Sequence, residues 1–279
     1  MTRTNRGAEG ISGRVIFADF FQQDARKNLS AKIATLLLAV SILSVSLNAN
    51  AALISYTGDG GVGLVYSSVS DVTWTQDANL LATLETTLGY STAINAIIAA
   101  SPVINDTPNF YDIPANSGQH SVTVSDFSAG GYASWFGAKA FVGYLNSINY
   151  GGSSQWRLPT SNQIFAYNGT AGNELGQLIY SELGGTPGNN IPNTATFNNE
   201  QAYAYWSGTE YAPTPSSAWF WYTFTGEQSI NYKGFQGFAW AVSPGQVSAV
   251  PLPATSWFML TGLLGFLGLK RFKKQSLGR

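Results

Sequence analysis

The sequence contains no cysteine and a single histidine, and both shortages exclude classes of function. Without cysteine the chain has no disulfide framework, no thiol nucleophile and no zinc-thiolate site. His120 lies in the stretch SGQHSVTV, and no G-x-S-x-G elbow of a serine hydrolase occurs in the chain. We therefore expect His120 to be an exposed loop residue and expect no catalytic constellation.

Basic residues are scarce between the two ends of the chain. Residues 52 to 269 hold three of them, Lys139, Arg157 and Lys233, against twelve acidic residues, so this body has a net charge of -9. A surface of this sign repels phosphate backbones, which disfavours nucleic-acid binding. Stability must come from a hydrophobic core, and the many Trp, Tyr and Phe residues provide the material for one.

The N-terminal region has the pattern of a secretory signal. The apolar run 33 to 45 follows basic residues and leads into NANA, where small residues favour cleavage after Ala51. Residues 1 to 51 are thus predicted to be a leader and signal peptide, with signal peptidase as a partner. The stretch 1 to 30 is long for such a leader, and either a misassigned start codon or a genuine extended leader explains it.

The C-terminal region has a sixteen-residue apolar segment, 254 to 269, followed by a basic cluster. As a helix this segment would be about 24 Å long at ~1.5 Å per residue, against a hydrocarbon core of about 30 Å. It can enter the membrane as a transmembrane helix but makes a short permanent anchor. The basic cluster should remain cytoplasmic, which places the body on the far side of the membrane.

Between these ends the pattern predicts one α+β domain, 52 to 246. Helices come first and short aromatic strands follow, an order typical of helices packed on a small antiparallel sheet. A strand is expected within 52 to 70 and a long loop at 102 to 131. Helices are expected at 77–90, 91–101, 134–149, from Thr160 with Gln163 completing a capping box, and at 173–185; strands at 202–211, 217–226, 229–235 and 237–245.

Five stretches occur together in order: VTWTQDANLL, SQWRLPTSNQI, YWSGTEY, SAWFWYTF and FAWAVSPG. Over roughly residues 71 to 246 they resemble the Lcl C-terminal-like domain family, a domain of unknown function related to the C-type-lectin-like fold. The resemblance implies this fold and a surface or extracellular binding protein. It implies no reaction, because members share none.

The tail, 250 to 274, resembles the PEP-CTERM sorting signal. Its motif reads Val250, Pro251, Leu252 and Pro253, with leucine in place of the usual glutamate, ahead of the apolar segment and the basic cluster. The resemblance implies an exosortase substrate of a Gram-negative bacterium. Such a protein passes through the inner membrane and is delivered to the cell surface or to the extracellular, exopolysaccharide-rich matrix of a biofilm.

Aromatic residues provide the candidate ligand-binding positions. Strand alternation places Trp219 and Trp221 on one face, and Phe220, Tyr222 and Phe224 on the other. One face must belong to the core. The other is either a platform for sugar rings or a surface covered by a loop, so Trp219, Trp221 and Tyr222 are the candidates.

Arg157, in the WRLPT stretch, is expected to be structural. A guanidinium can clamp a carboxylate through two hydrogen bonds, and we expect an internal partner such as Glu210. The complete set of residues assigned to this structural motif is Trp156, Arg157, Leu158, Pro159, Thr160, Trp206 and Glu210.

Three acids of the long loop, Asp106, Asp112 and Asp126, are the candidates for a calcium site, which needs six to eight oxygen ligands. The chain has no EF-hand spacing, so we expect solvated acids and no metal or other cofactor, with calcium as the alternative.

Together these patterns predict an exported, non-enzymatic surface or matrix protein that binds a glycan or another matrix component. Two rival hypotheses remain open at this stage. One is a secreted glycoside hydrolase with paired carboxylates. The other is a purely structural matrix component with no small ligand.

Overall fold

The computed structural model describes residues 53–167, 169 and 171–248. The predicted leader and signal peptide, 1 to 51, and the predicted sorting segment, 250 to 274, lie outside these residues. Within the described part no helix is both long and apolar enough to cross a membrane. The described part has the predicted mixed α+β architecture, with helices and small antiparallel sheets.

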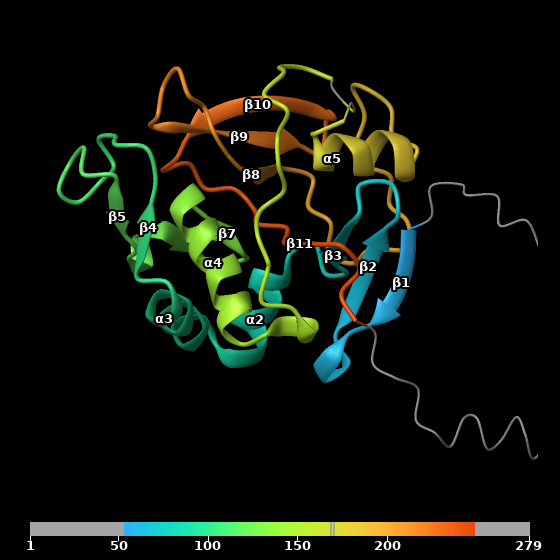
Figure 1. Cartoon of the computed structure of the whole chain (residues 1–279), viewed down its shortest axis with the longest axis horizontal. Helices are drawn as coiled ribbons and strands as arrows, with labels where there is room; N and C mark the ends of the chain where they lie inside the picture. The colour runs from blue at the N-terminus through green and yellow to red at the C-terminus, as the bar shows by residue number, and fades with distance from the viewer. Residues whose placement is uncertain (1–52, 168, 170, 249–279) are drawn as a thin grey trace, which may run out of the picture. The chain divides into compact units, whose positions relative to one another are not determined.

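The first sheet joins the two ends of the domain. Strands β1 (Leu53–Thr57) and β2 (Gly63–Ser67) form a hairpin across a short 3-10 turn, η1 (Asp59–Gly61), and β3 (Val72–Thr75) pairs antiparallel with β2. Strand β11 (Val242–Pro244) then pairs antiparallel with β3, which gives the order β1-β2-β3-β11. The first and last strands of the described domain therefore belong to one sheet (Figure 1).

Three of the expected helices are present where the period predicts them. They are α2 (Leu80–Leu88), α3 (Tyr90–Ala100) and α4 (Trp135–Ser147). Helix α4 begins at Ser134, whose hydroxyl oxygen accepts a hydrogen bond from the Gly137 amide at 3.0 Å. The stretch expected at 173–185 is a short helix, α5 (Glu174–Gly176), continued by one π-helical segment, η4 (Gln177–Glu182).

The second sheet is formed by β8 (Ala204–Glu210), β9 (Ser217–Tyr222) and β10 (Glu227–Tyr232), in the order β10-β9-β8. All three were expected as aromatic strands. Residues 102 to 131, expected to be a loop, contain further structure. They hold the hairpin β4 (Val103–Asn105) with β5 (Gln119–Ser121), the turn η2 (Val124–Asp126), and β6 (Phe127–Ser128), which pairs with β7 (Tyr132–Ala133); a last turn, η3, spans Tyr150–Gly152.

The prediction of a helix that begins at Thr160 is wrong. Residues 158 to 165 have no helical assignment because distant groups bind their backbone. The Thr160 amide donates to the Glu174 carboxylate at 2.7 Å, and the Ser161 amide donates to the Thr209 hydroxyl at 3.0 Å. Gln163 has a positive φ of 61°, which no capping box requires. These contacts outweigh the local Thr160 and Gln163 signal.

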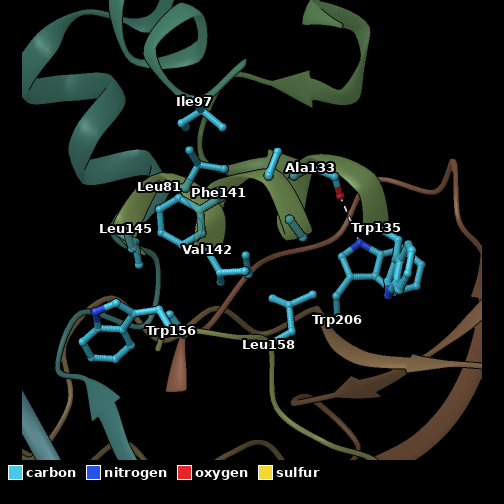
Figure 2. Packing of buried hydrophobic residues seen from close by; sticks show 14 of the residues in the cluster. Leu81, Ile97, Ala133, Trp135, Phe141, Val142, Leu145, Trp156, Leu158 and Trp206 are labelled. Carbon is cyan, nitrogen blue, oxygen red and sulfur yellow. Dashed lines mark hydrogen bonds between the residues drawn. The ribbon is translucent and has the colours of Figure 1, made fainter. Parts of the chain in front are cut away.

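The core consists of two aromatic clusters. One surrounds α4, where Phe141 and Leu145 pack with residues that include Trp156, Leu158 and Trp206 (Figure 2). The Trp206 indole N–H donates to the Ala133 carbonyl at 3.0 Å. The other cluster contains Trp74, Tyr205, Trp221, Phe238 and Trp240, all fully buried or nearly so. These large side chains supply the stability that a chain without disulfides needs.

Candidate functional site

A buried amine lies between two carboxylates where three strands end. Lys233 follows β10, Asp106 follows β4 and Glu210 ends β8. The Lys233 Nζ donates to the Asp106 Oδ2 and, at 2.7 Å, to the Glu210 Oε2. The side chains of Lys233 and Asp106 are fully buried, whereas that of Glu210 is 25% exposed. We call these three residues the Lys233 cluster.

Aromatic rings from the start of α4 enclose the amine. The Lys233 Nζ lies 4.7 Å from the centre of the Trp135 ring and 5.6 Å from that of Phe136. The Trp135 amide donates to the Lys233 carbonyl at 2.8 Å, so the backbone fixes this arrangement. Lys139 approaches the same Trp135 ring at 5.3 Å, and burial lowers the pKa of its amine. The rings exclude water and strengthen electrostatic interactions within the cluster.

The Lys233 cluster has one more carboxylate than it has amines. Burial raises the pKa of Asp106, and the hydrogen bond from Lys233 only partly opposes this effect. Asn109 donates its side-chain amide to the Asp106 Oδ2 at 2.8 Å, whereas the buried Oδ1 has no hydrogen-bond partner among the described residues. Burial therefore favours the protonated form of Asp106 more than it would for a solvated aspartic acid.

The loop acids Asp106, Asp112 and Asp126 are buried by protein contacts, so the expectation of solvated acids is wrong. Asp112 accepts hydrogen bonds from the Asn109 amide at 2.9 Å and the Gly118 amide at 2.7 Å. Among the described residues no group of three His, Cys, Asp or Glu side chains is arranged to hold a metal ion. Protein donors occupy the carboxylate oxygens of Asp112 and Asp126.

His120 is buried in β5, which corrects the expectation of an exposed loop residue. Its Nε2 lies 3.1 Å from the Asp126 Oδ2, its Nδ1 lies 2.8 Å from the Tyr111 carbonyl oxygen, and its ring stacks on Phe136 at 3.7 Å. Ser134 donates to the Asp126 Oδ1 at 2.6 Å. The carboxylate therefore lies between serine and histidine, whereas activating a serine requires the histidine beside it. This is a structural network.

Burial and hydrogen bonding act in opposite directions on the two ionisable members of this network. Burial lowers the pKa of His120, but its bonds to Asp126 and to the Tyr111 carbonyl outweigh this, so the net shift is upward. Burial raises the pKa of Asp126, but hydrogen bonds from His120, Ser134 and Thr123 lower it overall. Both shifts favour a charged imidazolium and carboxylate pair.

Arg157 is paired with an internal carboxylate, but the partner is Glu174 rather than Glu210. Its Nη1 donates to the Glu174 Oε2 at 2.7 Å and its Nη2 donates to the Oε1 at 2.6 Å. Glu210 is engaged by Lys233 instead. The backbone of Arg157 also exchanges two hydrogen bonds with Val242, so WRLPT is attached to the last strand of the domain.

Trp219 and Trp221, the candidate platform, are each 1% exposed, and Tyr222 is partly buried. Phe165 lies over Trp219 with ring centres 4.6 Å apart, and Tyr180 contacts Trp221 at 5.6 Å. A ligand cannot reach either indole because the segments before and after residue 170 cover this face of the sheet. Of the two alternatives, a surface covered by a loop describes Trp219, because Phe165 packs on its ring.

With this geometry established, the comparison with known proteins adds one finding. Residues 63–243 match the Lcl C-terminal domain. The chain belongs to the Lcl C-terminal domain family. No curated protein and no solved structure matches it. The family predicted from the five aromatic stretches is thereby confirmed, and every residue of the Lys233 cluster lies within its Lcl C-terminal domain.

The Lcl C-terminal domain exposes an apolar surface around Phe165, next to the covered Trp219. Ile164 is 54% and Phe165 49% exposed, and Tyr211 lies 6.0 Å from Phe165 at an interplanar angle of 75°. Tyr211 also contacts Trp219 at 5.6 Å. We call Ile164, Phe165 and Tyr211 the Phe165 surface. The positive φ of Gln163 and the bridge between Ala166 and Gln228 fix its backbone.

Asp106 and Glu210 are among the site residues predicted from the sequence, whereas Lys233 is not. A signal was available, because Lys233 is one of three basic residues in the body and lies between aromatic residues in the stretch NYKGF. A cation in such a position needs an anionic partner once buried. The sequence alone could not identify this partner, since Asp106 is 127 residues away.

Proposed function

We propose that this protein is exported, is not an enzyme, and uses its Lcl C-terminal domain to bind a neutral polysaccharide at the cell surface or in the surrounding matrix. The Phe165 surface carries the proposal. A half-exposed ring supported from behind by Trp219 and from the side by Tyr211 presents a rigid apolar face. Rigid aromatic faces suit sugar rings, which also have one apolar side.

The charge of the body supports a neutral ligand over an acidic one. At -9 the exported body repels uronic-acid and phosphate polymers at long range. The buried carboxylates do not favour hydrolysis of the ligand, because the Asp106 side chain is fully buried and neutralised by Lys233. A sugar cannot reach this acid without unfolding of the cluster, so we assign a binding role.

The binding test compares two aromatic variants of the full-length protein. We expect Phe165→Ala and Tyr211→Ala each to weaken binding to an insoluble neutral glucan by at least about tenfold, the scale of one lost aromatic contact. Tyr232→Ala, which removes a ring that is 59% exposed, provides the matched control. Equal binding by all variants, with and without calcium, would refute the role of the Phe165 surface. No binding to any polysaccharide would favour a purely structural matrix component.

Export and sorting form the second half of the proposal. The signal-peptide pattern supports cleavage after Ala51 by signal peptidase, and the resemblance of 250 to 274 to a PEP-CTERM segment supports processing by an exosortase. We further propose the C-type-lectin-like fold for the domain. Mass spectrometry of the protein recovered from the native cell surface tests the sorting: a form that still carries residues 270 to 279 would indicate a plain membrane anchor instead.

A further inference from the structure

The Lys233 cluster contains the three groups that amide formation requires: an amine, a carboxyl group in contact with it, and a second carboxylate to move protons. The contact between the Lys233 Nζ and the Asp106 carboxyl is direct, and both side chains are fully buried. Glu210 receives a hydrogen bond from the same Nζ at 2.7 Å and remains partly exposed. Three separate strand ends fix these positions, so the groups are held together by the fold.

We propose that Lys233 and Asp106 condense after folding into an intramolecular amide bond, with Glu210 as the proton carrier. A proton first moves from the Lys233 ammonium to the Asp106 carboxylate. The neutral Nζ then attacks the Asp106 carbonyl carbon, and the new C–N bond forms as the C–O bond breaks. Glu210 accepts a proton from the nitrogen and delivers it to the leaving hydroxyl. One water is released and Glu210 ends as the carboxylate it was at the start.

The surroundings favour each step of this reaction. The rings of Trp135 and Phe136 exclude water, so solvent does not compete for the reacting amine and carboxyl group. Burial raises the pKa of Asp106, which favours the protonated acid whose hydroxyl can leave.

Stabilisation of the developing negative charge is also available. The Asn109 side-chain amide donates to the Asp106 Oδ2 at 2.8 Å, and this bond strengthens when attack places charge on that oxygen. In the part of the chain that the structure describes, no group donates a hydrogen bond to the Asp106 Oδ1, so this oxygen can receive the proton and leave. Fixed contact between amine and carboxyl replaces a bimolecular encounter, which supplies a large part of the rate.

The cross-link would join β4 to the end of β10, two segments that are 127 residues apart in the chain. In a protein with no cysteine it would stabilise the fold as a disulfide does, because it reduces the conformational entropy of the unfolded chain. This role does not depend on polysaccharide binding, because the bond joins Lys233 and Asp106, whose side chains are fully buried and are not part of the Phe165 surface. A protein that binds no sugar can therefore still be cross-linked.

The test is the intact mass of the purified full-length protein under denaturing conditions. We expect a mass lower than that of the sequence by one water molecule. Digestion should then release a branched peptide in which the segment containing Lys233 is joined to the segment containing Asp106. An intact mass equal to that of the sequence would overturn the proposal. So would a water loss that maps to a linear peptide, because a succinimide would explain it.

Two near-isosteric variants separate the chemistry from the fold. Glu210→Gln should fold, as judged by an unchanged near-ultraviolet circular dichroism signal from the buried tryptophans, but should keep the mass of its sequence. Asp106→Asn should react by losing ammonia in place of water, and its final mass should equal that of the cross-linked wild type because both give the same amide. Full cross-linking of the Glu210→Gln variant would remove Glu210 from the mechanism.

Discussion

Two of the ion clusters described for this domain, those of Arg157 and Lys233, use their basic residues in opposite ways. Arg157 meets one carboxylate through two hydrogen bonds, its side chain is 35% exposed, and the charges balance. Lys233 meets two carboxylates, is fully buried, and is enclosed by rings. A guanidinium stays protonated and cannot act as a nucleophile, whereas an amine changes its protonation state with its surroundings. The first cluster fastens the chain, and the second holds reactive groups together.

Replacing the amine should have the largest effect. Lys233→Met leaves Asp106 and Glu210 facing each other without a cation and also removes the amine of the proposed amide bond. The loss of one partner from a buried ionic network alone costs about 3–5 kcal/mol of folding free energy. Denaturant unfolding monitored by tryptophan fluorescence measures this cost. Lys139→Met is the control, since the described contacts of Lys139 include no ion pair within 4.0 Å. Equal losses for the two variants would contradict the central position of Lys233.

Replacing the guanidinium of the Arg157 and Glu174 pair by an amine should have a smaller effect on the free energy of unfolding. Arg157→Lys keeps the positive charge but loses the two-bond fit to Glu174. We expect a loss of about 1 kcal/mol, since the side chain is 35% exposed and solvent screens the pair. The same unfolding experiment tests this. A loss as large as that of Lys233→Met would erase the contrast between the clusters.

The His120 and Asp126 pair should make stability depend on pH on both sides of a window. The raised pKa of His120 means that its contribution is complete below ~6.5 and declines as pH rises through the folded-state value. The lowered pKa of Asp126 means that its contribution is present above ~3.9 and declines as pH falls through the folded-state value. The contribution of the pair should therefore be largest between these two limits.

Comparison of His120→Gln with the wild type isolates this effect from other titrating groups. The difference in unfolding free energy, about 1 kcal/mol at pH 5.5, should shrink towards pH 8. A difference that does not change across this range would show that the imidazole contributes by packing against Phe136 alone.

The smallest effect on stability is expected at the exposed surface. Phe165 is 49% exposed, so Phe165→Ala should cost about 1 kcal/mol or less, mostly through the lost contact with Trp219. Thermal unfolding checks this. A much larger loss would mean that the ring is needed to cover the core, and the reduced sugar binding proposed for this variant would then reflect unfolding.

The parts of the fold that the sequence predicted are those determined by local pattern. Helix α4 is predictable because Ser134 caps it and its apolar residues follow the 3.6 period, as Phe141 and Leu145 show. Strand β9 is predictable because aromatic residues fill both of its faces. The segment after Pro159 is not, because its backbone is held by Glu174 and Thr209, which are distant in sequence.

The Arg157 pair and the Lys233 cluster likewise differ in how far the sequence predicts them. The sequence predicts that Arg157 pairs with an internal carboxylate, because an arginine is seldom buried unpaired. The residues around Arg157 do not show whether the partner is Glu174 or Glu210. The Lys233 cluster depends on the pairing of strands in two different sheets, which places Asp106 and Glu210 at one point. The spacing of these residues in the sequence does not predict that they lie together.

The position of β11 in the same sheet as β3 has a mechanical consequence. The end of the described domain is attached by the Gly245 amide to the Asp71 carbonyl at 2.8 Å and by the Val247 amide to the Thr73 hydroxyl at 3.1 Å. A pulling force applied just beyond these contacts would strip β11 from β3 and then unravel the chain backwards towards β10. An amide bond at Lys233 would stop the unravelling there, so force at this end would extend only the segment after Lys233, which contains β11, while the rest stayed folded.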